Sequence, residues 1–238
     1  MWEFIDKVVY INLDHREDRR QIMQKLFDQG QIPTEKVERF SAIKHKVGII
    51  GCAMGHISIL KRAKEQKWKS VLILEDDLEW IDFKENYNKL EELVSNPFDV
   101  CMLGGMYILT DPPKIISAIY TNAYIVKSHY YDTLLNNFEY GLSQKLNKIY
   151  VPPLFPKITS SKRERIYLEL VEKDNCHNVD IYWMKLQIKD NWVGIISPMI
   201  RQVISFSDIY GTSDRIYHDN DIKEFGLSWY NFFKSCYI

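Results

Sequence analysis

Three consecutive carboxylates, Glu75, Asp76 and Asp77, follow directly on the apolar run Ser70–Leu74 (SVLIL). Adjacent carboxylates repel one another and lose hydration when buried, so a hydrophobic core would not select them. Oxygen ligands suit Mg²⁺ or Mn²⁺, and alternate residues of an extended chain point the same way. We therefore expect Glu75 and Asp77 to reach one divalent cation, directly or through water, while Asp76 faces elsewhere. The alternative is an acidic strand end that lies in solvent or caps the next helix.

Two arginines, Arg16 and Arg19, stand near the start of an expected helix, with Asp18 between them. Helix N-termini and guanidinium groups both favour anionic ligands. A nucleotide could bind here, with Asn12 meeting its base or ribose. The alternative is an exposed first turn in which the arginines pair with Glu17 and Asp18.

A single histidine, His56, closes the glycine-rich segment Gly51–His56 (GCAMGH). A lone histidine on a helix more often packs or caps than catalyses, so both interpretations stay open. The pair Gly104-Gly105 at an expected strand end permits a ligand to approach the backbone, although turns use glycine for the same steric reason.

The elements that must position these residues begin with a β-branched run, Lys7–Asn12 (KVVYIN), which predicts a buried strand. Asp14 is the expected N-cap of the next helix, with Glu17 three residues later as in a capping box. Apolar residues then recur at helical spacing until Gly30 ends the pattern. These expected apolar positions are Ile22, Met23, Leu26 and Phe27.

The same alternation of strand and helix continues along the chain, which indicates an α/β fold with a mostly parallel sheet covered on both faces. In such sheets, ligands bind beyond the carboxyl ends of the strands, where Glu75–Asp77 fall. The pattern predicts helices over 53–68, from Asp82 onward and over 128–138, and strands over 70–74, 98–103, 118–126 and 192–196. One domain over 1–238 is expected, with a variable excursion at about 151–178.

Composition narrows the class of protein. The chain has 238 residues, 46% of them apolar, and a net charge of −1, which disfavours nucleic-acid binding through bulk electrostatics, although a local basic patch at Lys162–Arg165 stays open. The spacing of the four cysteines fits neither zinc nor disulfide frameworks, which favours reduced thiols, with Cys52 and Cys101 in the core. The sequence shows no run of about 20 apolar residues and no basic leader. A soluble protein of a bacterial or host cytoplasm is expected, and a homo-oligomer is left open.

Several short segments between about residues 7 and 210 carry distinctive motifs. They are Asn12–Arg19 (NLDHREDR), Glu38–Ala42 (ERFSA), Gly48–His56 (GIIGCAMGH), Leu72–Asp77 (LILEDD), Thr121–Val126 (TNAYIV) and Gln202–Ile209 (QVISFSDI). In order and spacing they resemble glycosyltransferase family 25, which includes lipooligosaccharide glycosyltransferases and procollagen galactosyltransferases.

The resemblance implies a GT-A-type, Rossmann-like fold and an inverting transfer of a hexose from a UDP-sugar. The acceptor would be a hydroxyl of a glycan or glycoprotein, as in lipopolysaccharide biosynthesis. Mn²⁺ or Mg²⁺ would be held by Glu75 and Asp77 and would stabilise the departing diphosphate. The residues expected around the nucleotide sugar are Asn12, Leu13, Arg16, Arg19, Ala42, His56 and Asp76.

The catalytic base is expected among acids that follow the variable segment. Inversion by direct displacement needs a base for the acceptor hydroxyl proton. Asp180 is the first candidate and Asp208 the second. Trp183 could stack on a sugar; the alternative is an Asp180 that caps a helix and a Trp183 in the core.

The sequence departs from the family pattern at Lys44 and Ile49, where acids are usual, and at Gly55, where a serine is usual. These changes surround the expected nucleotide pocket and leave the donor sugar open. They also favour the alternative of a catalytically inactive nucleotide-sugar-binding module. A phosphohydrolase of the haloacid dehalogenase type is disfavoured, because Glu75 stands where its aspartate nucleophile is needed.

Overall fold

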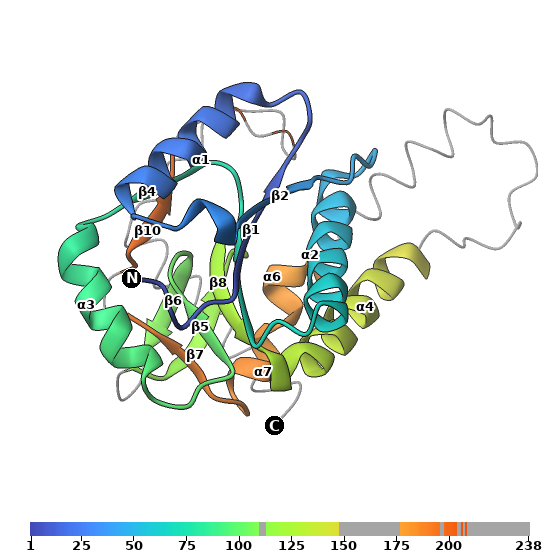
Figure 1. Ribbon diagram of the computed structural model, residues 1–238. Coiled ribbons are helices and arrows are strands. Elements are labelled where there is room, and N and C mark those ends of the chain that lie inside the picture. Colours follow the sequence, from blue (N-terminus) through green and yellow to red (C-terminus); the bar gives the residue numbers. More distant parts are fainter. Residues whose placement is uncertain (110–112, 148–176, 196–197, 204–205, 207, 209–238) are drawn as a thin grey trace, which may run out of the picture.

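The computed structural model describes residues 1–109, 113–147, 177–195, 198–203, 206 and 208 (Figure 1). Its centre is a six-stranded sheet of order β2-β1-β3-β8-β5-β9. Strand β8 is antiparallel to both neighbours, and the other adjacent pairs are parallel. The strands are β1 (Lys7–Asn12), β2 (Val37–Ser41), β3 (Ser70–Leu74), β5 (Val100–Met102), β8 (Ala123–Lys127) and β9 (Trp192–Gly194).

Two small antiparallel ribbons accompany the central sheet. Strand β4 (Leu78–Trp80) pairs with β10 (Ile200–Gln202), and β6 (Met106–Leu109) pairs with β7 (Ile115–Ile119). The first ribbon brings the chain after residue 198 back beside the acidic triplet, since β4 begins one residue after Asp77.

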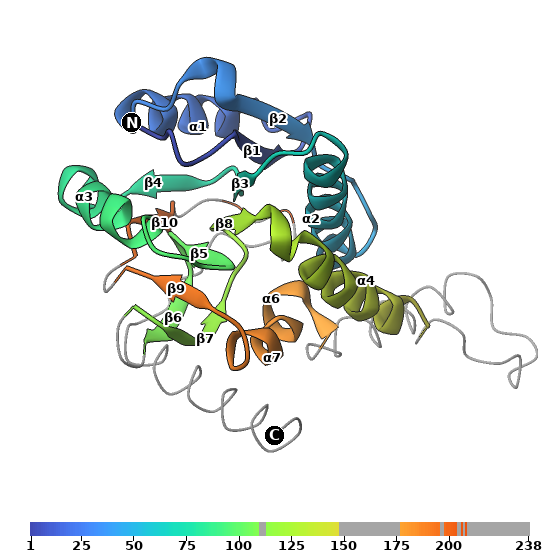
Figure 2. The same ribbon diagram turned by 60° about the horizontal axis from the view of Figure 1, so that its bottom comes forward.

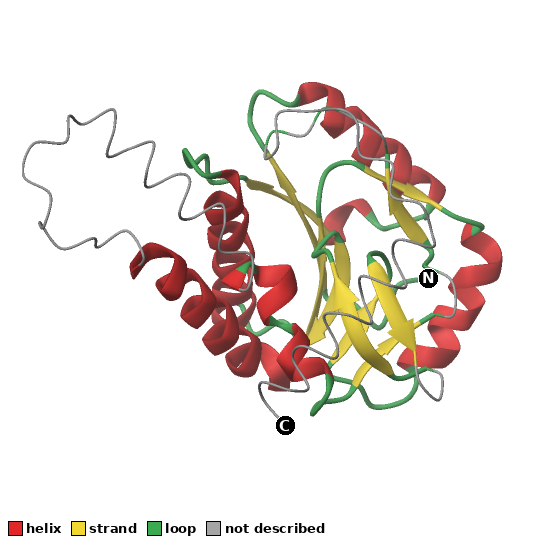
Figure 3. Cartoon of the chain, turned by 180° about the vertical axis from the view of Figure 1, so that it is seen from behind, coloured by secondary structure: helices red, strands yellow, loops and turns green. Residues whose placement is uncertain are grey.

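Helices cover both faces of the central sheet (Figures 2 and 3). On one face lie α1 (Glu17–Gln29) and α3 (Phe83–Val94), and on the other α2 (Gly48–Glu65), α4 (Tyr131–Asn147), α6 (Val179–Tyr182) and α7 (Met184–Gln187). Short 3₁₀ turns span Thr34–Lys36 and Ser128–Tyr130. Among the described residues, no helix combines the length and apolar character needed to cross a membrane.

Strand β3 shows why its sequence is an unbroken apolar run. Val71 and Ile73 pack in the core cluster of the α2/α4 face, whereas Leu72 and Leu74 pack in that of the α1/α3 face. All four side chains are fully buried. Each such side chain contributes about 1.5–3 kcal/mol relative to exposure, so β3 is firmly held at the point where the acids begin.

The expected fold class, a mostly parallel α/β sheet flanked by helices, is confirmed. The strands predicted over 7–12 and 70–74 match β1 and β3. The helices predicted over 53–68 and 128–138 exist with different bounds, Gly48–Glu65 and Tyr131–Asn147, and the strands predicted over 98–103 and 192–196 are shorter. The predicted excursion at 151–178 lies outside the described residues except for 177 and 178.

Two local predictions were wrong. The strand expected over 118–126 is two strands, because Tyr120 takes a left-handed backbone conformation (φ 70°) at the break between β7 and β8. Asp14 does not cap α1: the N-cap position is Arg16, which makes no side-chain capping hydrogen bond. The Asp14 carboxylate instead accepts hydrogen bonds from Arg39 and Ser41 of the adjacent strand β2.

Candidate active site

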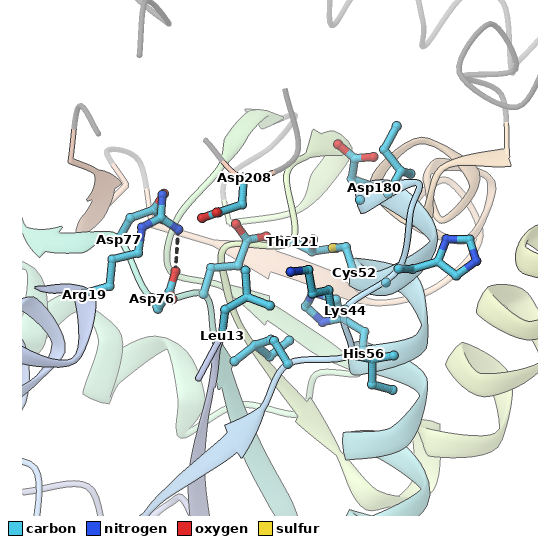
Figure 4. A pocket seen from close by; sticks show the side chains of 18 of the residues that line it. Leu13, Arg19, Lys44, Cys52, His56, Asp76, Asp77, Thr121, Asp180 and Asp208 are labelled. Atoms are coloured by element: carbon cyan, nitrogen blue, oxygen red, sulfur yellow. Dashed lines mark hydrogen bonds and ion pairs between the residues drawn. The ribbon is translucent and has the colours of Figure 1, made fainter. Parts of the chain in front are cut away.

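A cavity of about 330 Å³ opens at the carboxyl ends of β1, β2 and β3 (Figure 4). The parallel register places Tyr10 beside Leu74 and Asn12 beside Ser41, so the residues that follow the three strands meet at one edge of the sheet. The first half of α2, the Tyr120-Thr121 turn, the start of α6 and Gln202 of β10 complete the wall. This is the place where open α/β sheets bind ligands.

Most of the residues singled out from the sequence line this cavity: Leu13, Arg19, Ala42, His56, Glu75, Asp76, Asp77, Asp180 and Asp208. Asn12 and Arg16 do not line it. Lys44 and Ile49, the positions that depart from the family pattern, also line the wall. Gly104 and Gly105 form a turn elsewhere: Gly105 has φ 97°, and a Cβ on Gly104 would collide with Asn122. The steric interpretation of that pair is therefore the correct one.

Asp76 is buried, with 6% of its surface exposed, and both of its carboxylate oxygens are engaged. Arg19 Nη1 donates to Oδ1 at 2.6 Å, and Asn12 Nδ2 donates to Oδ2 at 2.7 Å. Charge-assisted hydrogen bonds of this kind are roughly twice as strong as neutral ones. Asp76 therefore anchors the triplet to β1 and α1 and has little capacity left for a ligand.

Glu75 and Asp77 lie on either side of that anchor and face the same side chain. Gln202 Nε2 lies 3.2 Å from Glu75 Oε2 and 3.4 Å from Asp77 Oδ1, which places the two carboxylates around one point. Thr121 Oγ1 donates to Glu75 Oε1 at 3.1 Å. Arg19 Nη2 lies 3.2 Å from Asp77 Oδ2.

The electrostatics of the two acids are unfavourable without a cation. Burial, followed by the charge of Asp77, raises the pKa of Glu75 to about 8. Burial also raises the pKa of Asp77, although the nearby Arg19 opposes this shift. Removing a carboxylate from water disfavours its charged form, and a nearby positive charge restores it. The pair is thus arranged to gain from a bound cation.

Asn12 lies behind the cavity and is fully buried. Besides donating to Asp76, its Nδ2 lies 3.0 Å from the Arg16 carbonyl oxygen, and its Oδ1 accepts from Arg39 Nε at 3.0 Å. Its amide is therefore occupied by protein partners, which disagrees with the predicted contact to a nucleotide base or ribose. Asn12 instead positions Asp76.

Arg16 also differs from its predicted role, because its guanidinium is held by two acids. It binds Asp18 at 2.7 Å and Asp208 at 2.5 Å, and it donates to the Phe206 carbonyl oxygen at 3.1 Å. The Arg16 pairing lowers the pKa of Asp18 to about 2. The alternative interpretation, a paired first turn, holds for Arg16, whereas Arg19 reaches the acidic triplet.

His56 is fully buried on α2, and its ring lies against Tyr124 and Phe138. Nδ1 lies 2.8 Å from the Tyr124 hydroxyl. Burial lowers the pKa of His56 to about 3, so the ring is neutral. One turn earlier, Cys52 is half-buried: it packs against the core as predicted and also lines the cavity, and Cys101 is buried as expected.

The glycine before Cys52 has a steric reason. A Cβ on Gly51 would collide with the carbonyl oxygen of Ile43, so the first turn of α2 packs directly on the loop that follows β2. That close approach brings Cys52 to the cavity wall.

Asp180 lies in the first turn of α6 and lines the cavity, whereas Asp208 lies across it beside Arg16 (Figure 4). Trp183 is fully buried, and its Nε1 donates to the Ala118 carbonyl oxygen at 2.8 Å. Stacking of Trp183 on a sugar is therefore excluded, and its placement in the core is correct. Thr121 and Gln202 belong to motif segments, but nothing in their type marked them as partners of Glu75.

Comparisons with known proteins agree with part of this description. No protein-family model matches the chain. Over 126 residues it is 32% identical to a "Putative glycosyltransferase" of Acanthamoeba polyphaga mimivirus. That match covers 44% of this chain and 39% of the relative, so the chain spans about two fifths of the relative's length. The similarity supports a glycosyltransferase-like protein and leaves its finer family open.

Two solved structures are also similar in part. A protein from STIV covers 90% of this chain and 99% of its own at 12% identity and a TM-score of 0.44. The 4-diphosphocytidyl-2C-methyl-D-erythritol synthase of Anaerococcus prevotii covers 96% of this chain and 79% of its own at 7% identity and a TM-score of 0.35. Likeness at this level carries no argument about function. The fold and site define an α/β protein with an acidic cavity at the carboxyl ends of its parallel strands.

Proposed function

We propose that this chain is a metal-dependent, inverting glycosyltransferase of GT-A type that moves a hexose from a UDP-sugar to a glycan or glycoprotein hydroxyl. The observation that carries the proposal is the pair Glu75 and Asp77, gathered around Gln202 at the carboxyl end of β3 while Asp76 anchors them from behind. The sequence similarity to a glycosyltransferase supports the class of reaction.

The donor set fits Mn²⁺ or Mg²⁺. Both carboxylates are partly buried oxygen ligands, and the raised pKa of each shows that neighbouring positive charge does not balance them. The metal would supply Lewis-acid stabilisation of the charge that grows on the departing diphosphate. Glu75 and Asp77 would hold it directly or through water.

Cationic side chains of the cavity would assist the diphosphate. Arg19 is fixed by Asp76 and faces the cavity next to Asp77, so its guanidinium is oriented before a ligand arrives. Lys44 lines the opposite wall (Figure 4). Preoriented charges stabilise a transition state without the cost of reorganisation.

Asp180 is the better candidate for the base that accepts the proton of the acceptor hydroxyl. It lines the cavity from α6, away from the arginines of α1. Asp208 is engaged by Arg16 at 2.5 Å, and His15 lies 3.4 Å away. A carboxylate held in that way serves better as an anchor for the chain around residue 208 than as a proton acceptor.

The test is a donor screen with the full chain: nucleotide sugars with and without Mn²⁺, reading release of nucleoside diphosphate. We expect Mn²⁺-dependent turnover of a UDP-hexose and a loss of at least about 100-fold in Asp77→Ala, as expected when a transition-state charge loses its partner. Asp132→Ala is the matched control, because this exposed acid pairs with Lys64 on the surface. Full activity in EDTA, or in Asp77→Ala, would contradict the metal assignment.

The second candidate function is an inactive nucleotide-sugar-binding module. It is favoured by Lys44 and Ile49, which line the cavity at positions where the resembled family carries acids. Calorimetry with UDP separates the two functions: binding without turnover of any donor supports the module, and turnover eliminates it.

A further inference from the structure

A second cluster of potential metal ligands lies on the α2 side of the cavity. Cys52, His56 and Glu75 each direct one ligand atom toward the others, and these sulfur, nitrogen and oxygen atoms lie within 4.8 Å of one another. Cys52 and His56 are four residues apart on α2, so they share one face of the helix. Glu75 reaches them from the end of β3.

The nitrogen of His56 gives an independent reason to expect a ligand. Its Nε2 atom is buried and has no hydrogen-bond partner among the described residues, while Nδ1 contacts the Tyr124 hydroxyl. A buried polar atom without a partner has lost its hydrogen bond to water and gains nothing in return, so such atoms are rare without a ligand. When Nδ1 donates its proton to Tyr124, Nε2 carries the lone pair that a metal would take.

We propose that Cys52, His56 and Glu75 form a binding site for a borderline-soft divalent cation, with Zn²⁺ as its natural class of ligand. Thiolate, imidazole and carboxylate are the three ligand types that zinc takes in proteins, whereas thiolate is foreign to Mg²⁺ sites. Three protein ligands leave a fourth position open to water or substrate. Here that position faces the cavity, because all three residues line it.

The surrounding side chains fit this assignment. A tetrahedral zinc ion holds sulfur, nitrogen and oxygen ligands about 3.5 Å apart, and the three ligand atoms already lie within 4.8 Å of one another. The Tyr124 hydroxyl fixes the His56 ring through Nδ1, and Thr121 Oγ1 donates to Glu75 Oε1 at 3.1 Å. Such outer partners orient the metal ligands.

This site shares Glu75 with the Mn²⁺ or Mg²⁺ site proposed for the donor diphosphate, but it does not rest on the proposed function. A thiophilic cation would use Cys52 and His56, whereas Mn²⁺ would use Asp77. Zinc would therefore compete with Mn²⁺ for Glu75.

The experiment is a Co²⁺ titration of the metal-free full chain followed by absorption spectroscopy. We expect one equivalent of Co²⁺ to produce a thiolate-to-cobalt charge-transfer band with intense tetrahedral visible bands, and Zn²⁺ to abolish both. Cys52→Ser is expected to lose the charge-transfer band. Cys101→Ala is the matched control and is expected to keep the band, because Cys101 packs in the core of the α1/α3 face and lies outside the cluster. Absence of the band in the unmodified protein, or its persistence in Cys52→Ser, would overturn the proposal.

Two further variants separate this proposal from its neighbours. Asp77→Asn keeps the charge-transfer band and loses Mn²⁺-dependent turnover, so each proposal can fail alone. Tyr124→Phe keeps the band but weakens Co²⁺ binding by about 10- to 100-fold, because the outer partner of His56 is lost. A measurement on the unmodified protein covers the case in which Cys52→Ser does not fold: Zn²⁺ should abolish alkylation of Cys52, mapped by mass spectrometry, and undiminished labelling contradicts the site.

Discussion

The two sides of the cavity handle charge in opposite ways. On the α1 side, Asp76 has Arg19 and Asn12 as partners, and Arg16 has Asp18 and Asp208. On the α2 side, Glu75 meets the neutral groups of Thr121, Cys52 and His56. One side is a network of ion pairs, and on the other side the side chains gathered around the Glu75 carboxylate are neutral donors or potential metal ligands.

This difference distinguishes carboxylates with a structural role from carboxylates that are suited to bind a ligand. A carboxylate whose charge the protein balances needs no ligand, and it can hold its neighbours in place. A carboxylate that burial penalises gains free energy from any cation that enters. The acidic triplet contains both kinds: Asp76 is the anchor, and Glu75 is the group that would gain from a cation. Asp77 is intermediate, because it is partly buried but lies near Arg19.

The largest effect is expected for Asp76→Ala, which removes the anchor of the α1 side. Arg19 then loses its contact with the buried carboxylate, and the buried Asn12 amide loses an acceptor. Breaking a buried pair by removing one partner costs about 3–5 kcal/mol. Urea unfolding would measure this loss as a lower free energy of unfolding. Asp132→Ala, on a surface pair with Lys64, is the control and should cost less than about 1 kcal/mol. Equal losses in the two variants would contradict the anchoring role.

The opposite sign is expected for Glu75→Gln in the metal-free protein. The folded-state pKa of Glu75, about 8, lies above its usual 4.5, so the folded protein binds this proton more tightly than the unfolded chain does. Stability from this group is therefore complete below about pH 4.5 and is lost as the pH rises toward 8. A neutral amide removes that penalty and should raise the free energy of unfolding at pH 8 by at least about 1 kcal/mol.

Unfolding curves between pH 5 and pH 8 check this prediction, with Glu79→Gln as the control because Glu79 is a partly exposed acid paired with Arg201. Mn²⁺ or Zn²⁺ should stabilise the unmodified protein at pH 8 and have no such effect on Glu75→Gln. A Glu75→Gln protein that is less stable at pH 8 would show that its carboxylate is already balanced.

The sequence predicted one side of this comparison better than the other. The unbroken apolar run of β3 followed by three acids located the site, because both faces of that strand are buried and its carboxyl end must meet a cavity or solvent. The roles of Asn12 and Arg16 could not be predicted in this way. Their partners, Asp76 and Asp208, are distant along the chain, so the pairing depends on the register of the sheet and on the return of the chain at β10.

Cys52 and Tyr120 show the same limit at a local scale. Apolar neighbours predicted a core cysteine but did not indicate that Cys52 also lines the cavity, because that depends on how α2 packs beside the loop that follows β2. The run 118–126 is mostly apolar but contains Thr121 and Asn122, and the break at Tyr120 rests on a left-handed conformation that its residue type does not favour.

The smallest effect in this series is expected for Arg16→Ala, which we compare with Arg19→Ala three residues further along. Arg16 pairs with Asp18, whose side chain is 61% exposed, and with Asp208 at the rim, so Arg16→Ala should change stability by less than about 1 kcal/mol. Arg19 has 10% of its side chain exposed and serves the buried Asp76, so Arg19→Ala should cost about 3 kcal/mol or more. Urea unfolding of both variants, each compared with Arg20→Ala on the exposed side of the helix, measures the contrast. Arg16 and Arg19 have the same charge and side-chain length, and their side chains are 12% and 10% exposed. A difference between the two variants therefore points to burial of the partner acid as the cause, whereas equal losses would mean that the network of ion pairs extends to the rim.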